Sequence, residues 1–150
     1  MELIKSFDYY CCLLQFPNGT IIPFLKIQEG YPINYLEIMS YLDNADPKNL
    51  DNIIQHIEQD VFMHKKRFVL DQYQTTLVVI NSEYSEVYEQ FTRNILFRME
   101  TQFFMDLLKK WRDFCVDFQK QQWRCVPRDQ VKPEYLSLLE QRNKPEDLNL

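Results

Sequence analysis

Apolar and polar residues recur with different periods along the chain, and these periods predict strands and helices. Two apolar runs, 7–16 and 21–27, flank the dipeptide Asn18-Gly19. Both turn residues tolerate a positive φ, so this arrangement predicts a β-hairpin. Pro23 lies in the second run and has no amide hydrogen to donate. It therefore predicts an edge position for that strand.

Three stretches have the spacing of amphipathic helices. Apolar residues recur at steps of three and four in 33–42 and again in 50–62. Asp46 and Pro47 precede the second stretch and suit the N-cap and the first helical position. The clearest helix begins near Thr101, a candidate N-cap. Its apolar face is formed by Phe104, Leu107, Leu108, Trp111, Cys115 and Phe118.

Further strands are predicted in the middle of the chain. Residues 68–70 and 75–80 are rich in apolar and β-branched side chains, and a short polar turn around Asp71 and Gln72 joins them. Residues 94–99 form a third short apolar run. Residues 83–91 are ambiguous, with a weak fit to a helix through Tyr84, Val87, Tyr88 and Phe91.

The expected architecture is α+β, an antiparallel sheet packed against amphipathic helices in one globular domain over 1–125. The composition changes after Gln119, where Pro127, Pro133 and Pro145 interrupt polar residues. Residues 126–150 are expected to form an irregular C-terminal extension, in which 133–140 has the pattern of one short docked helix.

Composition excludes several classes of function. The chain has 150 residues and only 2 glycines, whereas phosphate-binding loops need several glycines at fixed offsets. The net charge of -5 disfavours direct binding to DNA or RNA, which requires a basic face. No apolar run is long enough to span a bilayer, and the N-terminus lacks the pattern of a secretory signal. We expect a cytoplasmic protein without a membrane anchor.

Candidate chemistry is sparse. Cys11, Cys12, Cys115 and Cys125 form no CxxC pair, which favours reduced, mostly buried thiols. His56, Asp60 and His64 stand four residues apart on one predicted helix, but the chain has no HExxH motif. They are interpreted as helix-surface residues, although metal binding stays open as a third hypothesis. We expect no catalytic residues, no metal and no cofactor.

The charge distribution is the more informative signal. Residues 1–60 contain nine acids and three bases, a net of −6, and 29–60 contain seven acids against one base. If the predicted helices lie side by side, this segment presents an acidic surface. Such a surface either keeps the chain soluble or docks a basic partner. The candidate partner-binding residues are Tyr35, Glu37, Tyr41, Asp43, Asp46, Asp51, Glu58 and Asp60.

The segment 97–114 resembles an end piece of small bacterial immunity proteins, which neutralise toxins used in interbacterial competition. In these families an acidic residue and Thr or Ser end a strand, and a helix of the form apolar-x-x-Leu-Leu-x-x-Trp-x-x-Phe follows. The matching residues are Glu100, Thr101, Phe104, Leu107, Leu108, Trp111 and Phe114. The resemblance extends over about residues 68–118. It implies a small acidic binding protein without catalysis.

The resulting hypothesis is an immunity or antitoxin inhibitor whose acidic face blocks a basic toxin domain, with a nuclease as the favoured toxin. The alternative is a structural or adaptor subunit of a homo-oligomer or larger complex.

Overall fold

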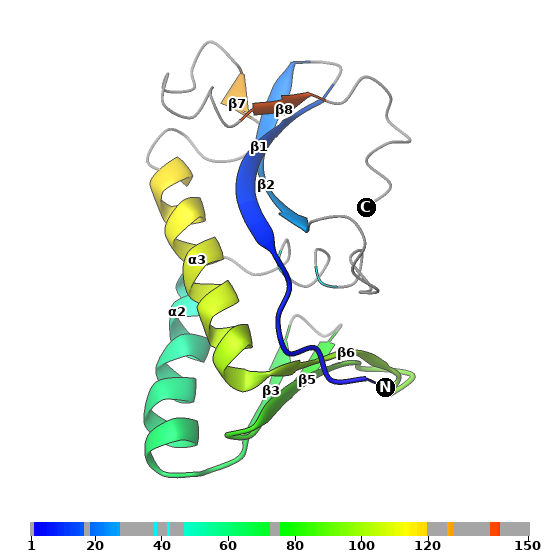
Figure 1. Ribbon diagram of the computed structural model, residues 1–150, viewed down its shortest axis with the longest axis vertical. Helices are drawn as coiled ribbons and strands as arrows, with labels where there is room; N and C mark the ends of the chain where they lie inside the picture. The colour runs from blue at the N-terminus through cyan, green and yellow to red at the C-terminus, as the bar shows by residue number, and fades with distance from the viewer. Residues whose placement is uncertain are drawn as a thin grey trace.

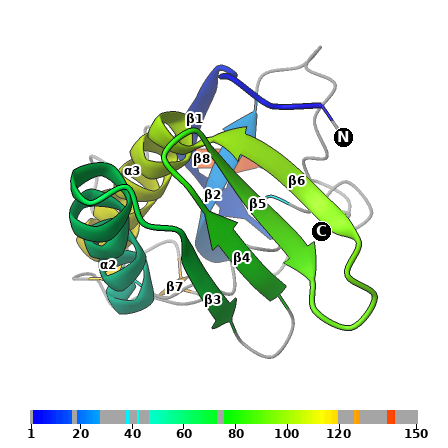
Figure 2. The same ribbon diagram turned by 90° about the horizontal axis from the view of Figure 1, so that it is seen from below.

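The computed structural model describes residues 2–16, 19–27, 38, 42, 47–72, 76–119, 126–127 and 139–141. The described part of the chain contains two four-stranded sheets, with helices running along one side of both (Figures 1 and 2). The predicted α+β class is therefore confirmed, with two sheets in place of one.

The first sheet is built on the predicted hairpin. Strands β1 (Tyr9–Gln15) and β2 (Thr20–Ile27) are antiparallel, with Cys12 opposite Phe24. Gly19 has a φ of 88°, and its amide donates to the Phe16 carbonyl at 2.9 Å, which closes the turn. The prediction of this hairpin is confirmed; Asn18 lies outside the described residues.

Two short segments from the C-terminal region complete this sheet, in the order β7-β2-β1-β8. β7 (Val126–Pro127) is antiparallel to β2, and β8 (Leu139–Gln141) is parallel to β1. β2 is thus covered at its start, where Thr20 and Ile21 pair with β7. The predicted edge position of Pro23 holds only for the later part of β2, among the described residues.

The second sheet consists of four sequential antiparallel strands. These are β3 (Phe68–Gln72), β4 (Thr76–Ile80), β5 (Tyr84–Glu89) and β6 (Ile95–Glu100). Three of these strands were predicted, but Asp71 and Gln72 continue β3 and do not form the turn.

Residues 83–91, whose sequence pattern is ambiguous, contain strand β5, so the weak fit to a helix is not realised there. Val87 points into the core, whereas Glu86 and its neighbours two residues away lie on the opposite face, as in a strand. The amides of Glu83 and Tyr84 both donate to Asn81 Oδ1 at 2.9 Å, which fixes the turn before β5. The apolar positions of this segment suited both periods, and pairing with β4 and β6 selected the strand.

The helices run along one side of the molecule, past both sheets (Figure 1). α2 (Pro47–His56) begins at the predicted Pro47 and continues into a π-helical segment, η1 (Ile57–Met63). The proposed N-cap Asp46 lies outside the described residues. Of the predicted helix 33–42, Ile38 and Leu42 are described; both are helical and buried.

α3 (Thr101–Gln119) is the longest element and contacts α2, β2, β5 and β6 (Figure 1). Thr101 begins this helix, but its hydroxyl is used elsewhere. Its Oγ1 donates to the Asn81 carbonyl at 2.6 Å and shares a 3.0 Å hydrogen bond with Ser85 Oγ. Thr101 therefore ties α3 to the second sheet, and the prediction of a simple N-cap is corrected. The predicted apolar face is buried throughout, at Phe104, Leu107, Leu108, Trp111, Cys115 and Phe118.

The predicted helix over 133–140 is wrong at its end, because Leu139 and Glu140 belong to β8. The backbone of these residues pairs with β1, which gives the extended conformation a partner that the local pattern does not reveal. The remaining positions of that prediction lie outside the described residues.

The packing of α3 predicts a large stability difference between two identical substitutions. Phe104 is fully buried, so Phe104→Ala should lower the free energy of unfolding by about 3–5 kcal/mol. Phe91 is 83% exposed, so Phe91→Ala should change it by less than about 0.5 kcal/mol. Urea denaturation of both variants measures the difference. Equal losses would contradict the assignment of α3 to the core.

Candidate partner-binding site

Three of the eight predicted site residues lie in the described part of the chain. Asp51 is on α2, and Glu58 and Asp60 are on η1. The other five lie outside the described residues: Tyr35, Glu37, Tyr41, Asp43 and Asp46. The geometry of the candidate site is therefore that of its α2–η1 portion.

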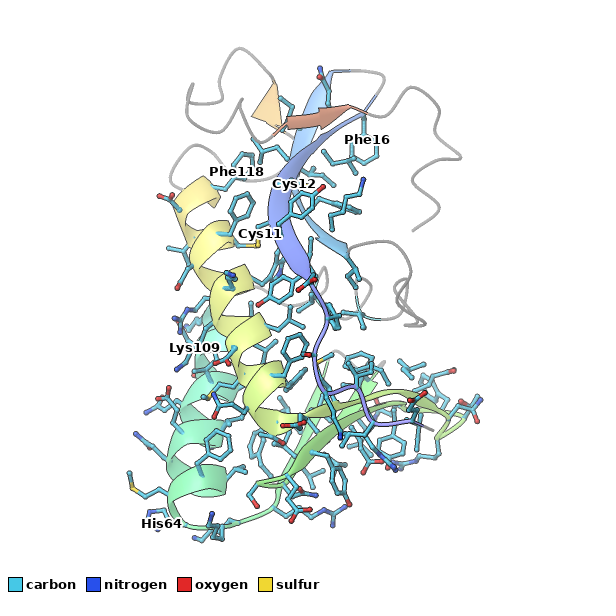
Figure 3. The ribbon with its side chains drawn as sticks, viewed as in Figure 1. Cys11, Cys12, Phe16, His64, Lys109 and Phe118 are labelled. Atoms are coloured by element: carbon cyan, nitrogen blue, oxygen red, sulfur yellow. The ribbon has the colours of Figure 1, made fainter. Side chains whose placement is uncertain are left out.

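Asp51 and Glu58 lie on the flank of α2 and η1 that faces α3. Asp51 accepts from Arg112 Nη1 at 2.9 Å, and Glu58 is 2.7 Å from Lys109 Nζ. Lys109 lies on the side of α3 toward α2 (Figure 3). The pairing order shows that the two helices run antiparallel, because the earlier acid meets the later base. Acids of α2 and η1 thus face bases of α3 where the two helices pack together.

These ion pairs are open to solvent. The side chains of Asp51 and Glu58 are 59% and 49% exposed. Burial alone would lower the pKa of Arg112, but hydrogen bonds to Asp113 and Asp51 outweigh it and raise that pKa. Exposed pairs of this kind contribute about 0–1 kcal/mol each. They orient the carboxylates without removing them from solvent.

Asp60 has a different partner. His56 Nδ1 lies 2.7 Å from Asp60 Oδ2, and the imidazole stacks on Phe68 with ring centroids 4.5 Å apart. The hydrogen bond from His56 is the main cause that lowers the pKa of the Asp60 carboxyl. The third member of the metal hypothesis, His64, follows the end of η1 (Figure 3). Among the described residues, no group of three His, Cys, Asp or Glu side chains is arranged to hold a metal ion.

The described cysteines lie on β1, at Cys11 and Cys12, and on α3, at Cys115. Cys12 and Cys115 are buried, and Cys11 is half-buried. Burial raises the pKa of the Cys11 thiol to about 11, against a smaller opposite effect of the Lys110 ammonium. A thiol with this pKa is protonated near neutral pH, so Cys11 lacks the thiolate that nucleophilic catalysis requires.

A polar cluster on the outer face of the second sheet was not predicted. Glu86 Oε2 accepts from Arg98 Nη2 at 2.7 Å, from Arg98 Nε at 3.1 Å and from the Tyr88 hydroxyl at 2.9 Å. The Arg98 guanidinium lies 5.3 Å from the centroid of the Tyr84 ring. These hydrogen bonds to Glu86 raise the pKa of Arg98. Alternation of Tyr84, Glu86 and Tyr88 is the sequence signal of this cluster, and the ambiguous pattern of 83–91 concealed it.

Lys109 and Arg112 were also missed as parts of the site. They stand three residues apart on α3, which places them on one helix flank. Their acidic partners lie 51 and 61 residues earlier in the chain. Only the crossing of α2 and α3 brings them together, so no local pattern identifies the pairs.

Comparison of the chain with protein-family models, with curated proteins and with solved structures finds no significant match. Within the part of the chain that the structure describes, no helix is both long enough and apolar enough to cross a bilayer.

The Glu86 cluster predicts a strong asymmetry between single and double substitutions. The Glu86 side chain is only 8% exposed, so Arg98→Leu leaves a nearly buried carboxylate without its cation. We expect a loss of about 3–5 kcal/mol in the free energy of unfolding, and a much smaller loss for Glu86→Leu with Arg98→Leu. Lys109→Leu, in an exposed pair, is the matched control and should cost at most about 1 kcal/mol. Chemical denaturation that gave equal losses for the single and double variants would contradict this account.

Proposed function

We propose that this chain is a non-catalytic binding protein of the immunity or antitoxin kind, whose acidic face covers the basic active-site cleft of a toxin. The supporting observation is the concentration of seven acids against one base in residues 29–60. Asp51 and Glu58 of this segment keep about half of their side-chain surface in solvent. The proposal is for a protein that acts in the cytoplasm.

The carboxylates are suited to a basic cleft by their chemistry. A carboxylate can occupy the place of a substrate phosphate, and its hydrogen bonds with Arg or Lys are charge-assisted. Nucleases hold phosphates in such clefts, so a nuclease is the toxin class that we favour. A concentrated negative field would also accelerate encounter with a basic partner.

The basic residues of α3 compete with the partner for these carboxylates. Lys109 and Arg112 already pair with Glu58 and Asp51, so a basic partner must compete with them. Breaking these pairs costs little free energy, because exposed ion pairs contribute about 0–1 kcal/mol each. Until a partner arrives, the pairs hold the two carboxylates on one rigid helix flank, which reduces the ordering cost of binding.

The proposal predicts a charge-dependent association rate. The partner to use is the toxin domain that the proposal requires, sought first at the C-terminus of a large secreted protein encoded immediately upstream. Association is measured by stopped-flow mixing at two salt concentrations. The variant Asp43→Lys, Asp46→Lys, Asp51→Lys should associate at least about tenfold more slowly at low salt, and the difference should shrink at high salt. The matched control makes the same change in net charge outside the segment, with Glu2→Lys, Glu83→Lys, Glu89→Lys, and should retain most of the rate.

Two results would contradict the proposal. An unchanged association rate in the first variant refutes the placement of the binding face. Failure of the wild-type chain to bind this domain, or to protect cells that express it, refutes the immunity function itself.

A further inference from the structure

The two edges of the second sheet differ in how they are covered. Beyond β6, the Ile4 amide donates to the Arg98 carbonyl at 2.9 Å, and the Glu100 amide donates to the Ile4 carbonyl at 2.8 Å. The N-terminal segment thus occupies that edge. At the opposite edge, no strand of the described residues pairs with the outer side of β3 (Figure 2). With respect to the described strands, β3 therefore presents an open edge, which is a template for another strand.

The side chains of β3 alternate between the core and the open face. Phe68 and Leu70 pack against the core. Val69 points the other way and is 50% exposed, and Arg67, just before the strand, is also exposed. An exposed β-branched residue in the middle of an open edge favours strand pairing. The residues flanking Val69 then decide which strand fits.

The sequence around Val69 is complementary to itself in charge. In an antiparallel pair of identical strands, directly opposed residues share a face, so residue 69 meets residue 69 when the two-fold axis passes through it. This register places residue 67 opposite residue 71, an arginine opposite an aspartate, in both halves. It also places Phe68 opposite Leu70.

The neighbouring registers fit less well. A two-fold axis at residue 68 sets Arg67 opposite Val69 and Lys66 opposite Leu70. An axis at residue 70 sets Val69 opposite residue 71, which is an aspartate. Both alternatives place a charged residue opposite an apolar one. The axis at residue 69 instead places apolar residues opposite apolar residues, and an arginine opposite an aspartate.

From this complementarity we propose that two copies of the chain associate through antiparallel pairing of their β3 edges, with the two-fold axis at Val69. The β3-β4-β5-β6 sheets of the two copies then form one continuous eight-stranded sheet. The association is symmetric and closes on itself, so it yields a dimer and not a filament. It uses a different surface from the acidic α2–η1 flank and does not depend on the proposed toxin. A contact limited to one strand pair is small, so the dimer is weak and forms reversibly.

The test measures association of the full chain by sedimentation over roughly 10 μM to 1 mM, the range in which weak contacts assemble. Arg67→Asp alone sets aspartate opposite aspartate, and Asp71→Arg alone sets arginine opposite arginine. Each single variant should weaken dimerisation by about tenfold or more, because both symmetric pairs change from attraction to repulsion. The double variant restores opposite charges and should return the dissociation constant to within about threefold of wild type.

Two further variants keep the result interpretable. Arg93→Asp makes the same chemical change at an exposed residue of the β5–β6 turn, and should leave association unchanged. Its φ of 63° is one that aspartate tolerates. Val69→Lys places two ammonium groups at the two-fold axis and should abolish the dimer, while circular dichroism confirms that the variant folds. A wild-type chain that stays monomeric over the whole range overturns the proposal, as does a double variant that fails to recover.

Discussion

The apolar face of α3 is the constraint on which the rest of the structure depends. Phe104 and Phe118 are fully buried near opposite ends of the helix, and Trp111 between them is 2% exposed. The helix contacts β2 in one sheet and β5 and β6 in the other. Its apolar side chains therefore pack against both sheets. In Figure 1 the two sheets lie at different levels along α3, which joins them. The buried side chains of α3 belong to the same hydrophobic core cluster as residues of both sheets.

The same helix determines the chemistry of the candidate site. α2 packs on α3, and this contact brings Lys109 and Arg112 to Glu58 and Asp51. The resulting pairs are exposed and individually weak, so their main effect is to orient carboxylates. By contrast, the Glu86 carboxylate is nearly buried and accepts hydrogen bonds from Arg98 and Tyr88, which makes it a structural element of the second sheet. The burial of the carboxylate distinguishes the structural pair from the orienting pairs. The N–O distances do not, because they are similar in all three pairs.

Sequence patterns predicted the elements whose conformation is decided locally. The hairpin around Gly19 and the helix from Thr101 have strong local signals, and both were found where expected. Elements decided by distant partners were not predicted. β5 has apolar positions that suit a helix and a strand equally, and pairing with β4 and β6 decides between them. β8 is extended because it pairs with β1, more than 120 residues earlier. The partners of Asp51 and Glu58 depend on a helix crossing that no local period encodes.

The central claim is that α3 unites the two sheets in one cooperative core. Native-state hydrogen exchange in increasing denaturant tests it most directly, through amides of Leu14 in β1, Val78 in β4 and Leu108 in α3. The account predicts that all three exchange only through global unfolding, with the same free energy and the same dependence on denaturant. Exchange of Leu14 at a clearly lower free energy, while Val78 and Leu108 remain protected, would show that the first sheet opens on its own and would contradict the claim.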